Sequence, residues 1–433
     1  MKSMNIAFFT NQIPDSPLEH IRVVGPISYT NINLLMGPEL KNNIYKNIYE
    51  ADLVLIQRVF PSDFNTFKKI LNISRTLEKP LVFDLDDNLF ILPENHPDRL
   101  AFGVSRALMP MLYAAFNSDL VTVSNEYLKN SLSDLNGNIK VLPNYIDDSI
   151  WTFAPPKSQQ IGEAIKVGYM GGDSHKPDLE MISKILIDVK DRYADKIGYH
   201  FYGIKPPDAI LALPDTIWTP IKTYNYADFA DEFQNLDVDF FLAPLVDNEF
   251  NRCKSSIKFM EYSVLGVPGI YSQVVPYNDI VENGKSGFLA TSVEEWKKYI
   301  ELLVNNPTLR HQIGKNAQNL VKENYLMSQN ASKWHRVYRE VIDQGISKQS
   351  SNSVPQAMAE TITHQLHDYQ QNIDKKLSQC YTKLNAVKYE LNARELDIED
   401  LKEEILDYAL SKSWRLTRPL RKFNKIVKGR NDH

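Results

Sequence analysis

Residues 251–290 read NRCKSSIKFMEYSVLGVPGIYSQVVPYNDIVENGKSGFLA, and they contain a helical pattern, a strand pattern and a glycine-rich turn in succession. We expect the helix to begin at Ser255 and Ser256, because serine caps a helix by accepting a hydrogen bond from its first turn. The helix should end sharply at Gly266-Val267-Pro268, since glycine closes a helix and proline cannot continue one. The apolar run Val267–Ser272 then predicts a buried strand.

Two lysines and one glutamate accompany this helix. A helix N-terminus presents unpaired N–H groups and a positive dipole, which together seat a phosphate. Lys254 and Lys258 add positive charge there, and Glu261, two turns in, is able to accept hydrogen bonds from a pair of sugar hydroxyls. The same residue types suit a capped core helix with surface lysines, so the residues alone leave both interpretations open.

Short apolar strands alternate with amphipathic helices along most of the chain. In residues 1–150 the expected strands are Asn5–Phe9, Asp52–Gln57, Pro80–Asp86, Leu120–Ser124 and Lys140–Pro143. After the linker 151–163, which is rich in Pro, Ser and Gln, residues 164–345 repeat the alternation with expected strands Lys166–Met170, Tyr199–Tyr202, Thr216–Trp218, Val238–Pro244 and Val267–Ser272. The pattern predicts an α/β protein with two facing Rossmann-like domains and a ligand cleft at the carboxyl ends of their strands.

The composition excludes several classes of protein. The 433 residues carry 54 acidic and 49 basic groups, a net charge of −5, which gives no reason to expect a nucleic-acid partner. The two cysteines, Cys253 and Cys380, lie far apart and form no CxxC pair, so a disulfide framework or zinc cluster is not expected and a reducing compartment fits. No apolar run approaches the roughly 18 residues of a membrane span, and the apolar run near the N-terminus is too short for a signal peptide.

The stretch 251–290 resembles the carboxy-terminal signature of the retaining nucleotide-sugar glycosyltransferases of family 4, which have the GT-B fold of two Rossmann-like domains. Glu261 matches the glutamate that precedes "A-x-x-G-x-P" in that family and binds the ribose hydroxyls of the nucleotide. The turn Asp279–Gly287 matches the "E-x-I-x-x-G-x-x-G" segment, with Asp in place of Glu. The resemblance covers residues 1–343 and implies a nucleotide-sugar donor.

One position departs from the family pattern. Family members often carry two glutamates separated by seven residues, and the first of them contacts the donor sugar. Cys253 occupies that position here. Either Lys254 and the neighbouring backbone replace the contact, or the choice of donor differs.

A second element, VGYMGGDSHKPD at residues 167–178, predicts a strand that opens through Gly171 and Gly172 into a helix. Glycines allow the backbone to approach a diphosphate closely. In the family an arginine and a lysine follow this strand and hold the diphosphate. Lys176 matches the lysine, and His175 is the candidate to replace the absent arginine, although a surface histidine without this role fits as well.

A third element is the acidic run Asp84–Asn88, directly after an expected strand. Carboxylates that lie close together raise one another's proton affinity, which suits proton transfer, and Asp86 and Asp87 are the candidate catalytic carboxylates. In the resemblance, Asp86 falls where family members often have a histidine that contacts the donor sugar. Helix capping or loop hydrogen bonding are the alternatives. GT-B enzymes generally need no metal, so no metal or other cofactor is expected.

Two further segments fit the same scheme. The loop containing Arg22, HIRVVGP, precedes an expected helix, and in such enzymes the first loop of the amino-terminal domain faces the donor phosphates. Arg22 is therefore a candidate phosphate ligand. Asn144 and Asp147, in LPNYID, resemble the family's interdomain segment and are expected to hold the crossing between the domains.

The composition changes after residue 345. Residues 346–358 form a polar linker, and residues 359–410 carry a seven-residue repeat that predicts a coiled coil, with a long helix packed on the core as the alternative. Arg394 falls at a seam position and would specify the register. The two apolar series are Leu366, Ile373, Cys380, Val387, Arg394, Leu401 and Tyr408, and Leu377, Leu384, Leu391, Ile398 and Ile405.

Residues 411–433 contain eight Lys or Arg residues and one Asp, a balance of +7, interleaved with apolar residues. Such a segment suits the anionic inner face of a membrane, with a solvated tail as the alternative. Its sequence SKSWRLTRPLR also resembles a tail of bacterial glycosyltransferases that assemble surface polysaccharides.

These observations predict a cytoplasmic glycosyltransferase, peripheral to the inner face of the plasma membrane, which self-associates through its coiled coil. It would transfer a sugar from a nucleotide donor to a lipid-linked or growing surface glycan such as O-antigen or capsule, with retention of configuration. Two alternatives are a catalytically weak GT-B scaffold of a polysaccharide synthase complex, which Cys253 favours, and a nucleotide-sugar epimerase. The sequence does not identify the sugar, the base, the linkage or the acceptor.

Overall fold

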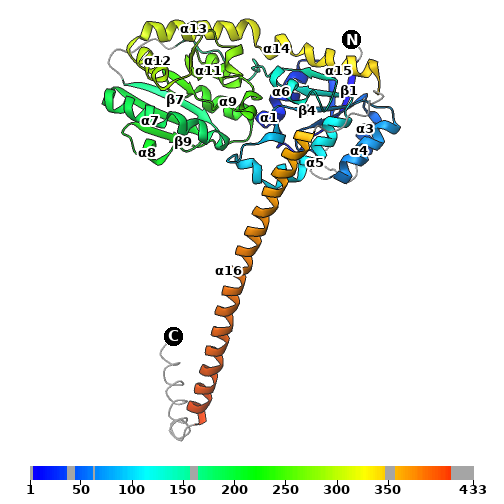
Figure 1. The fold of residues 1–433 in the computed structure, drawn as a ribbon, viewed down its shortest axis with the longest axis vertical. Coiled ribbons are helices and arrows are strands. Elements are labelled where there is room, and N and C mark those ends of the chain that lie inside the picture. Colours follow the sequence, from blue (N-terminus) through cyan, green and yellow to red (C-terminus); the bar gives the residue numbers. More distant parts are fainter. Residues whose placement is uncertain (1–2, 37–43, 62–63, 157–163, 347–355, 411–433) are drawn as a thin grey trace, which may run out of the picture. The chain divides into compact units, whose positions relative to one another are not determined.

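The computed structural model describes residues 3–36, 44–61, 64–156, 164–346 and 356–410. The chain forms two compact units (Figure 1). Residues 1–366 contain both sheets, and residues 367–433 contain most of the long helix α16 (Gln356–Leu410).

The first sheet has six parallel strands in the order β2-β1-β3-β4-β5-β6. Its strands are β1 (Met4–Phe9), β2 (Ile32–Leu35), β3 (Leu53–Gln57), β4 (Leu81–Leu85), β5 (Leu120–Val123) and β6 (Ile139–Val141). The helices between them are α1 (Pro17–Glu19), a π-helical turn (His20–Val24), α2 (Gly25–Ser28), α3 (Ile44–Glu50), α4 (Phe64–Thr76), α5 (Phe102–Asn117) and α6 (Glu126–Leu132).

The second sheet also has six parallel strands, in the order β12-β11-β10-β7-β8-β9. Its strands are β7 (Ile165–Gly171), β8 (Ile197–Gly203), β9 (Thr216–Thr219), β10 (Phe240–Ala243), β11 (Gly269–Ser272) and β12 (Phe288–Ala290). Its helices are α7 (Lys176–Tyr193), α8 (Asp208–Leu211), α9 (Tyr226–Gln234), α10 (Glu249–Arg252), α11 (Ile257–Val264), α12 (Val293–Asn305) and α13 (Pro307–Asn324). The prediction of two Rossmann-like sheets is confirmed, and the structure adds the short edge strands β2 and β12 to the expected five of each.

Each sheet is buried on both faces because its strands send alternate side chains to two core layers. In β10, Phe240 and Leu242 enter one apolar cluster and Phe241 and Ala243 enter another. Near-continuous apolar runs of this kind are what a parallel sheet between two helical layers requires.

The chain crosses between the domains a second time near residue 325, where Ile146 and Leu326 form an isolated parallel bridge. Helices α14 (Met327–Asn330) and α15 (Ser332–Gln344) then lie over the first sheet (Figure 1). Trp334 and Tyr338 are buried in the same cluster as Met4 and Ile6 of β1. The sequence placed this helix in the second domain, because an amphipathic period identifies an apolar face but not the sheet that it covers.

Helix α16 begins within the first unit, where Ile362 is buried in the core of the first domain. From His367 onward it belongs to the second unit. There the leucine, valine and isoleucine residues of the seam from Leu377 to Ile405 are exposed, from 49% for Leu384 to 68% for Ile405. The helix itself is confirmed, while the coiled coil stays a prediction. The basic tail, residues 411–433, lies outside the described residues. Among the described helices, none has the length and apolar character to cross a membrane.

Candidate active site

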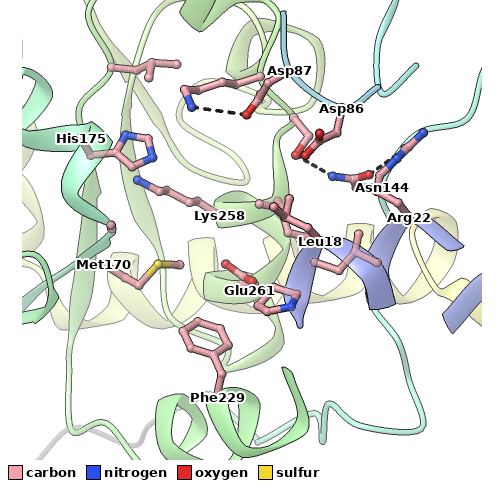
Figure 2. A pocket seen from close by; sticks show the side chains of 18 of the residues that line it. Leu18, Arg22, Asp86, Asp87, Asn144, Met170, His175, Phe229, Lys258 and Glu261 are labelled. Atoms are coloured by element: carbon pink, nitrogen blue, oxygen red, sulfur yellow. Dashed lines mark hydrogen bonds and ion pairs between the residues drawn. The ribbon is translucent and has the colours of Figure 1, made fainter. Parts of the chain in front are cut away.

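A cavity of about 260 Å³ opens between the two domains, at the carboxyl ends of β4, β7 and β10 (Figure 2). This edge is where open α/β sheets bind their ligands. The structure brings ten of the twelve predicted site residues to its wall: Arg22, Asp86, Asp87, Gly171, Gly172, His175, Lys254, Ser255, Lys258 and Glu261. Lys176 and Ser256 are not among the lining residues.

Lys258 and Glu261 lie one turn apart on α11 and are both buried, with 7% and 4% exposure. Neither the Lys258 Nζ nor the Glu261 Oε2 has a hydrogen-bond partner. Burial lowers the pKa of Lys258 to about 8, and burial raises the pKa of Glu261 to about 8, with each charge partly offsetting the effect on the other. A buried polar atom without a partner is costly, so these two groups are suited to a ligand that brings an anion and a hydroxyl.

The N-terminus of α11 is also open. Its N-cap residue, Ser256, makes no side-chain capping bond. Ser255 Oγ accepts a hydrogen bond of 2.9 Å from Asn144 Nδ2 of the first domain. The first N–H groups of α11 therefore remain for an anion at the cavity, as the sequence predicted for a phosphate.

The Gly-Gly turn ends β7 as expected. A side chain at Gly171 would meet the Tyr169 hydroxyl at 2.9 Å, whereas Gly172 has open space around it. His175 Nδ1 lies 2.7 Å from Asp178 Oδ2. Burial lowers the pKa of His175 to about 3, so the ring is neutral at pH 7, donates from Nδ1 to the carboxylate and keeps Nε2 as an acceptor. His175 therefore does not supply the positive charge expected of an arginine replacement.

Lys176 lies away from the cavity. Its side chain is 68% exposed and its Nζ is 3.9 Å from Glu180 of the next turn. A short 3-10 turn, Asp173–His175, separates β7 from α7, and the turn length decides which side of the helix each residue takes. The expected role of Lys176 at a diphosphate does not fit this position.

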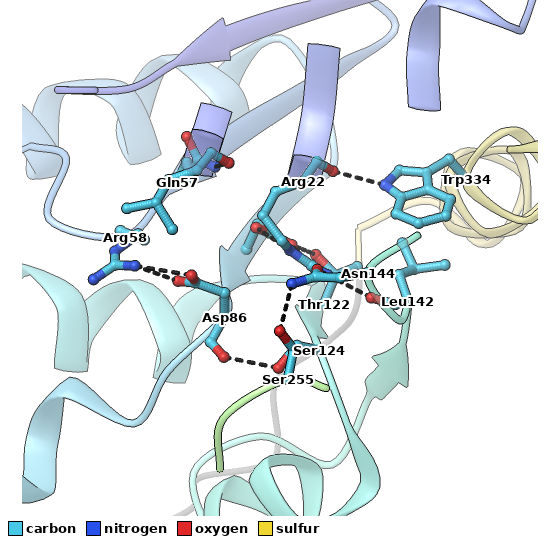
Figure 3. A network of polar contacts seen from close by, with 12 residues as sticks. Arg22, Gln57, Arg58, Asp86, Thr122, Ser124, Leu142, Asn144, Ser255 and Trp334 are labelled. Atoms are coloured by element: carbon cyan, nitrogen blue, oxygen red, sulfur yellow. Dashed lines mark hydrogen bonds and ion pairs between the residues drawn. The ribbon is translucent and has the colours of Figure 1, made fainter. Parts of the chain in front are cut away.

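Arg22 is buried and donates four hydrogen bonds within the first domain (Figure 3). Its Nε and Nη2 donate to the two carboxylate oxygens of Asp84 at 3.2 and 2.7 Å, and its Nη1 donates to Leu142 O and Asn144 Oδ1 at 2.5 and 2.9 Å. Trp334 Nε1 donates to the Arg22 carbonyl at 2.9 Å. These bonds give Arg22 a structural role, in which it orients Asn144 toward Ser255. Its role as a phosphate ligand stays a prediction.

Asp86 forms a buried ion pair that the sequence did not reveal. Arg58 Nη1 donates to both carboxylate oxygens of Asp86, at 2.7 and 2.9 Å. Burial and the charge of Asp87 raise the pKa of Asp86, while Arg58 opposes them. Arg58 directly follows β3 and Asp86 directly follows β4, and these two strands are neighbours in the sheet. The order of the strands would therefore have been needed to predict this ion pair.

Asp87 faces the second domain. Its Oδ2 lies 3.9 Å from Lys254 Nζ, and both side chains are largely buried, with 21% and 14% exposure.

The Cys253 side chain is fully buried and packs in the core of the first domain, where burial raises the pKa of its thiol to about 12. Asn125 Nδ2 donates to the carbonyls of Cys253 and Lys254 at 2.8 Å each. The departure from the two-glutamate pattern thus places Lys254, and not Cys253, at the cavity.

The interdomain crossing is held by Asp147, as its sequence position suggested. Asp147 Oδ2 lies 2.7 Å from His20 Nε2, and its Oδ1 accepts a hydrogen bond of 2.6 Å from the Tyr29 hydroxyl.

Within the described ranges, no group of three or more His, Cys, Asp or Glu side chains has an arrangement that could hold a metal ion.

The chain is similar to one sequence profile and to several solved structures. Residues 255–320 match the sequence profile described as "Glycosyl transferases group 1", and no curated protein sequence matches the chain. HepE of Anabaena, solved in complex with UDP-glucose, is 16% identical with a TM-score of 0.56, over 78% of this chain and 100% of HepE. A glycosyltransferase from Rickettsia africae is 12% identical with a TM-score of 0.53, over 79% and 99% of the two chains. TarM of S. aureus is 15% identical with a TM-score of 0.50, over 66% of this chain and 54% of TarM, so this chain spans about half the length of TarM.

The matched segment begins at the open end of α11 and includes Lys258 and Glu261. This segment and the two-sheet fold are those of a glycosyltransferase: the segment is similar to group 1 glycosyltransferases, and the fold is similar to that of HepE.

Proposed function

We propose that this enzyme transfers a sugar from a nucleotide-sugar donor to a lipid-linked or growing surface glycan, with retention of the anomeric configuration. The observation that carries the donor part is the pair of buried, unpartnered groups, Lys258 Nζ and Glu261 Oε2, on one wall of the interdomain cavity. Lys258 and the N-terminus of α11 receive the diphosphate, and Glu261 receives the ribose hydroxyls. HepE binds UDP-glucose with the same fold, which supports UDP-glucose as the first donor to test.

The chemistry asked of the protein is stabilisation of the departing diphosphate. The acceptor oxygen forms a bond to the anomeric carbon on the face from which the diphosphate leaves, and the acceptor proton passes to the departing diphosphate oxygen. Negative charge grows on that oxygen, so the ammonium groups of Lys258 and Lys254 and the N–H groups of α11 contribute most in the transition state. Asp86 and Asp87, on the opposite wall, orient hydroxyls of the sugar or of the acceptor.

Binding and turnover test this proposal. Titration calorimetry with UDP-glucose should show binding to the wild type and loss of affinity in Lys258→Ala. Lys184→Ala, which removes an exposed lysine from α7, is the matched control and should bind as the wild type does. A panel of nucleotide sugars, each with and without glycan acceptor, should release nucleotide faster with the acceptor present, and NMR of the product should show the donor's anomeric configuration. An inverted product would contradict the mechanism.

A second candidate function, a catalytically weak scaffold, draws support from Cys253. Cys253 occupies the position where this family often has a glutamate that contacts the donor sugar, and its side chain is buried in the first domain and does not line the cavity. The same panel separates the two functions, because a scaffold binds nucleotide but releases none from any donor when the acceptor is supplied.

The acceptor and location rest on the carboxy-terminal part. The basic tail, residues 411–433, would hold the enzyme at the anionic inner face of the plasma membrane, where lipid-linked acceptors of O-antigen or capsule type are assembled. A chain shortened after residue 410 should fail to co-sediment with vesicles that contain anionic lipid, while it still binds nucleotide. Retained vesicle binding would place the anchor elsewhere. The exposed seam of α16 supports self-association.

A further inference from the structure

The second unit exposes an apolar stripe that has no covering partner among the described residues. Leu377 is 53% exposed, Leu391 is 56% exposed and Ile398 is 51% exposed, although all lie on one helix at spacings of seven. A single helix in water gains little from such a stripe, because helices in proteins owe most of their stability to packing of their apolar face. The stripe is therefore suited to cover by another helix.

We propose that two copies of the chain pair through residues 373–408 as an antiparallel two-stranded coiled coil. This inference rests on the self-association proposed above and adds its stoichiometry, direction and register. In the heptad, Leu377, Leu384, Leu391, Ile398 and Ile405 take position a, and Ile373, Cys380, Val387, Arg394 and Leu401 take position d. Successive a and d residues lie three and four apart, which is the seam of a left-handed coiled coil.

The direction follows from the distribution of charge along the helix. From Lys375 to Lys388 the sequence has four lysines and no acidic residue, whereas from Glu390 to Asp407 it has eight acidic and two basic residues. A parallel pair in register would place the basic halves together and the acidic halves together. An antiparallel pair centred on position 389 places each basic half beside an acidic half, and charge complementarity of this kind sets the orientation of coiled coils.

The flanking positions agree with this register. In this register the g positions of the two copies lie beside one another, so Lys376 and Lys383 lie beside Glu404 and Asp397 of the second copy, and Glu390 lies beside its own counterpart at the centre. Lys376, Lys383, Asp397 and Glu404 are all exposed in the single chain. In the parallel arrangement Lys383 would instead lie beside Lys388, a like-charge pair. These exposed pairs contribute little each, but they recur in both halves of the symmetric dimer.

Arg394 also favours the antiparallel arrangement. It is exposed and holds a d position, so a parallel dimer would oppose two guanidinium groups across the seam. In the antiparallel register it packs opposite Leu384, with its alkyl stem on the seam and its charged end able to reach water. One polar residue at a seam position fixes the register at some cost in stability.

Cys380 provides a native reporter of direction, because it is exposed at a d position. In a parallel dimer Cys380 faces Cys380, and in the antiparallel dimer it faces Ile398. The other cysteine, Cys253, is buried with a protonated thiol and does not compete. The full-length wild type, Ile398→Cys, and Ile398→Cys combined with Cys380→Ser would each be oxidised and run on a non-reducing gel.

The antiparallel dimer predicts a covalent dimer for Ile398→Cys alone, and none for the wild type or the double variant. A parallel dimer predicts a covalent dimer in all three and would overturn the proposal. Light scattering should give a dimer mass for the reduced protein. A monomer mass would overturn self-association as well, and a trimer would overturn the two-helix arrangement.

The salt dependence of dimer dissociation tests the direction of the helices independently of the cross-linking. Screening weakens the attraction between basic and acidic halves, so the antiparallel dimer should dissociate more readily as salt rises, whereas a parallel dimer would become tighter. Affinity for UDP-glucose, measured on the same samples, should not change with the seam substitutions. Failure of the coiled coil thus leaves the nucleotide-binding result intact, and failure of donor binding leaves the cross-linking result intact.

Discussion

Replacement of Glu261 by glutamine should make the ligand-free protein more stable at alkaline pH and weaken its affinity for the donor. In the folded protein, burial raises the pKa of Glu261 from 4.5 to about 8, whereas the unfolded chain has the ordinary value. Between these values the folded state holds a proton that the unfolded state has released, so the stability due to this group is complete below pH 4.5 and declines as the pH rises to 8. Glutamine resembles the protonated form and removes the decline.

The upper bound of the effect is the difference of 3.5 pKa units, which corresponds to about 5 kcal/mol at 1.36 kcal/mol per unit. The usual cost of one unsatisfied buried polar group is about 1–3 kcal/mol, and we expect the gain of Glu261→Gln above pH 8 to lie in that range. Urea unfolding at pH 5 and pH 9 measures it, with the two proteins equal at pH 5. Glu180→Gln, at an exposed residue of α7, is the matched control and should show no such difference.

Donor binding should move in the opposite direction. Loss of a charged hydrogen bond to the ribose costs about 1.5–3 kcal/mol, which weakens the affinity of Glu261→Gln for UDP-glucose by roughly 10- to 150-fold. Hydroxyl donors favour the carboxylate form, so the wild type should release up to one proton per donor bound at pH 7, and the variant should release none. Calorimetry in two buffers of different ionisation enthalpy measures this release. A variant that is less stable at pH 9, or that binds the donor as tightly as the wild type does, would refute the reasoning.

The other predictions concern the groups around Glu261. Lys254→Ala should lower turnover by roughly tenfold, about 1.4 kcal/mol, with a smaller effect on donor binding, because its charge acts on the departing diphosphate; steady-state kinetics beside calorimetry would show equal losses if it merely binds. Asp86→Asn should fold, since the amide oxygen still accepts from Arg58, and should lower transfer by roughly 10- to 150-fold at unchanged nucleotide affinity; transfer at the wild-type rate would make the carboxylate structural. Arg22→Leu should destabilise the protein by about 3–5 kcal/mol by leaving Asp84 buried without its partner, and thermal unfolding that matches the wild type would contradict its structural role.

The sequence was sufficient for the parts of the site that lie on one element. Glu261 and Lys258 follow the start of α11 at fixed helical spacing, so one local pattern located both of them at the cavity. Gly171 and Gly172 were found in the same way, from the end of a strand. The position of a residue within a helix or at the end of a strand depends on a few neighbouring residues, so it can be predicted from a short stretch of sequence.

The sequence was insufficient where a contact joins distant segments. The Arg58–Asp86 pair depends on which strands are neighbours, and the bonds from Asn125 to residues 253 and 254 depend on how two domains meet. Lys176 was misplaced because one short turn after β7 rotates the following helix. The edge strands β2 and β12 have four and three residues, too few for a recognisable alternation.

The docking of α15 on the first sheet has a consequence for how the chain folds during synthesis. Met4, Ile6 and Phe8 of β1 form one core layer with Trp334, Tyr338 and Val341, so this layer joins residues more than 300 positions apart. Translation adds about 5–20 residues per second, and roughly 10–40 s separate the completion of β6 from the emergence of α15. During that interval the apolar face of β1 is incompletely covered on the nascent chain. The amino-terminal domain is thus synthesised first but completed last, and a ribosome-bound chain that stops before α15 should recruit chaperones through that face.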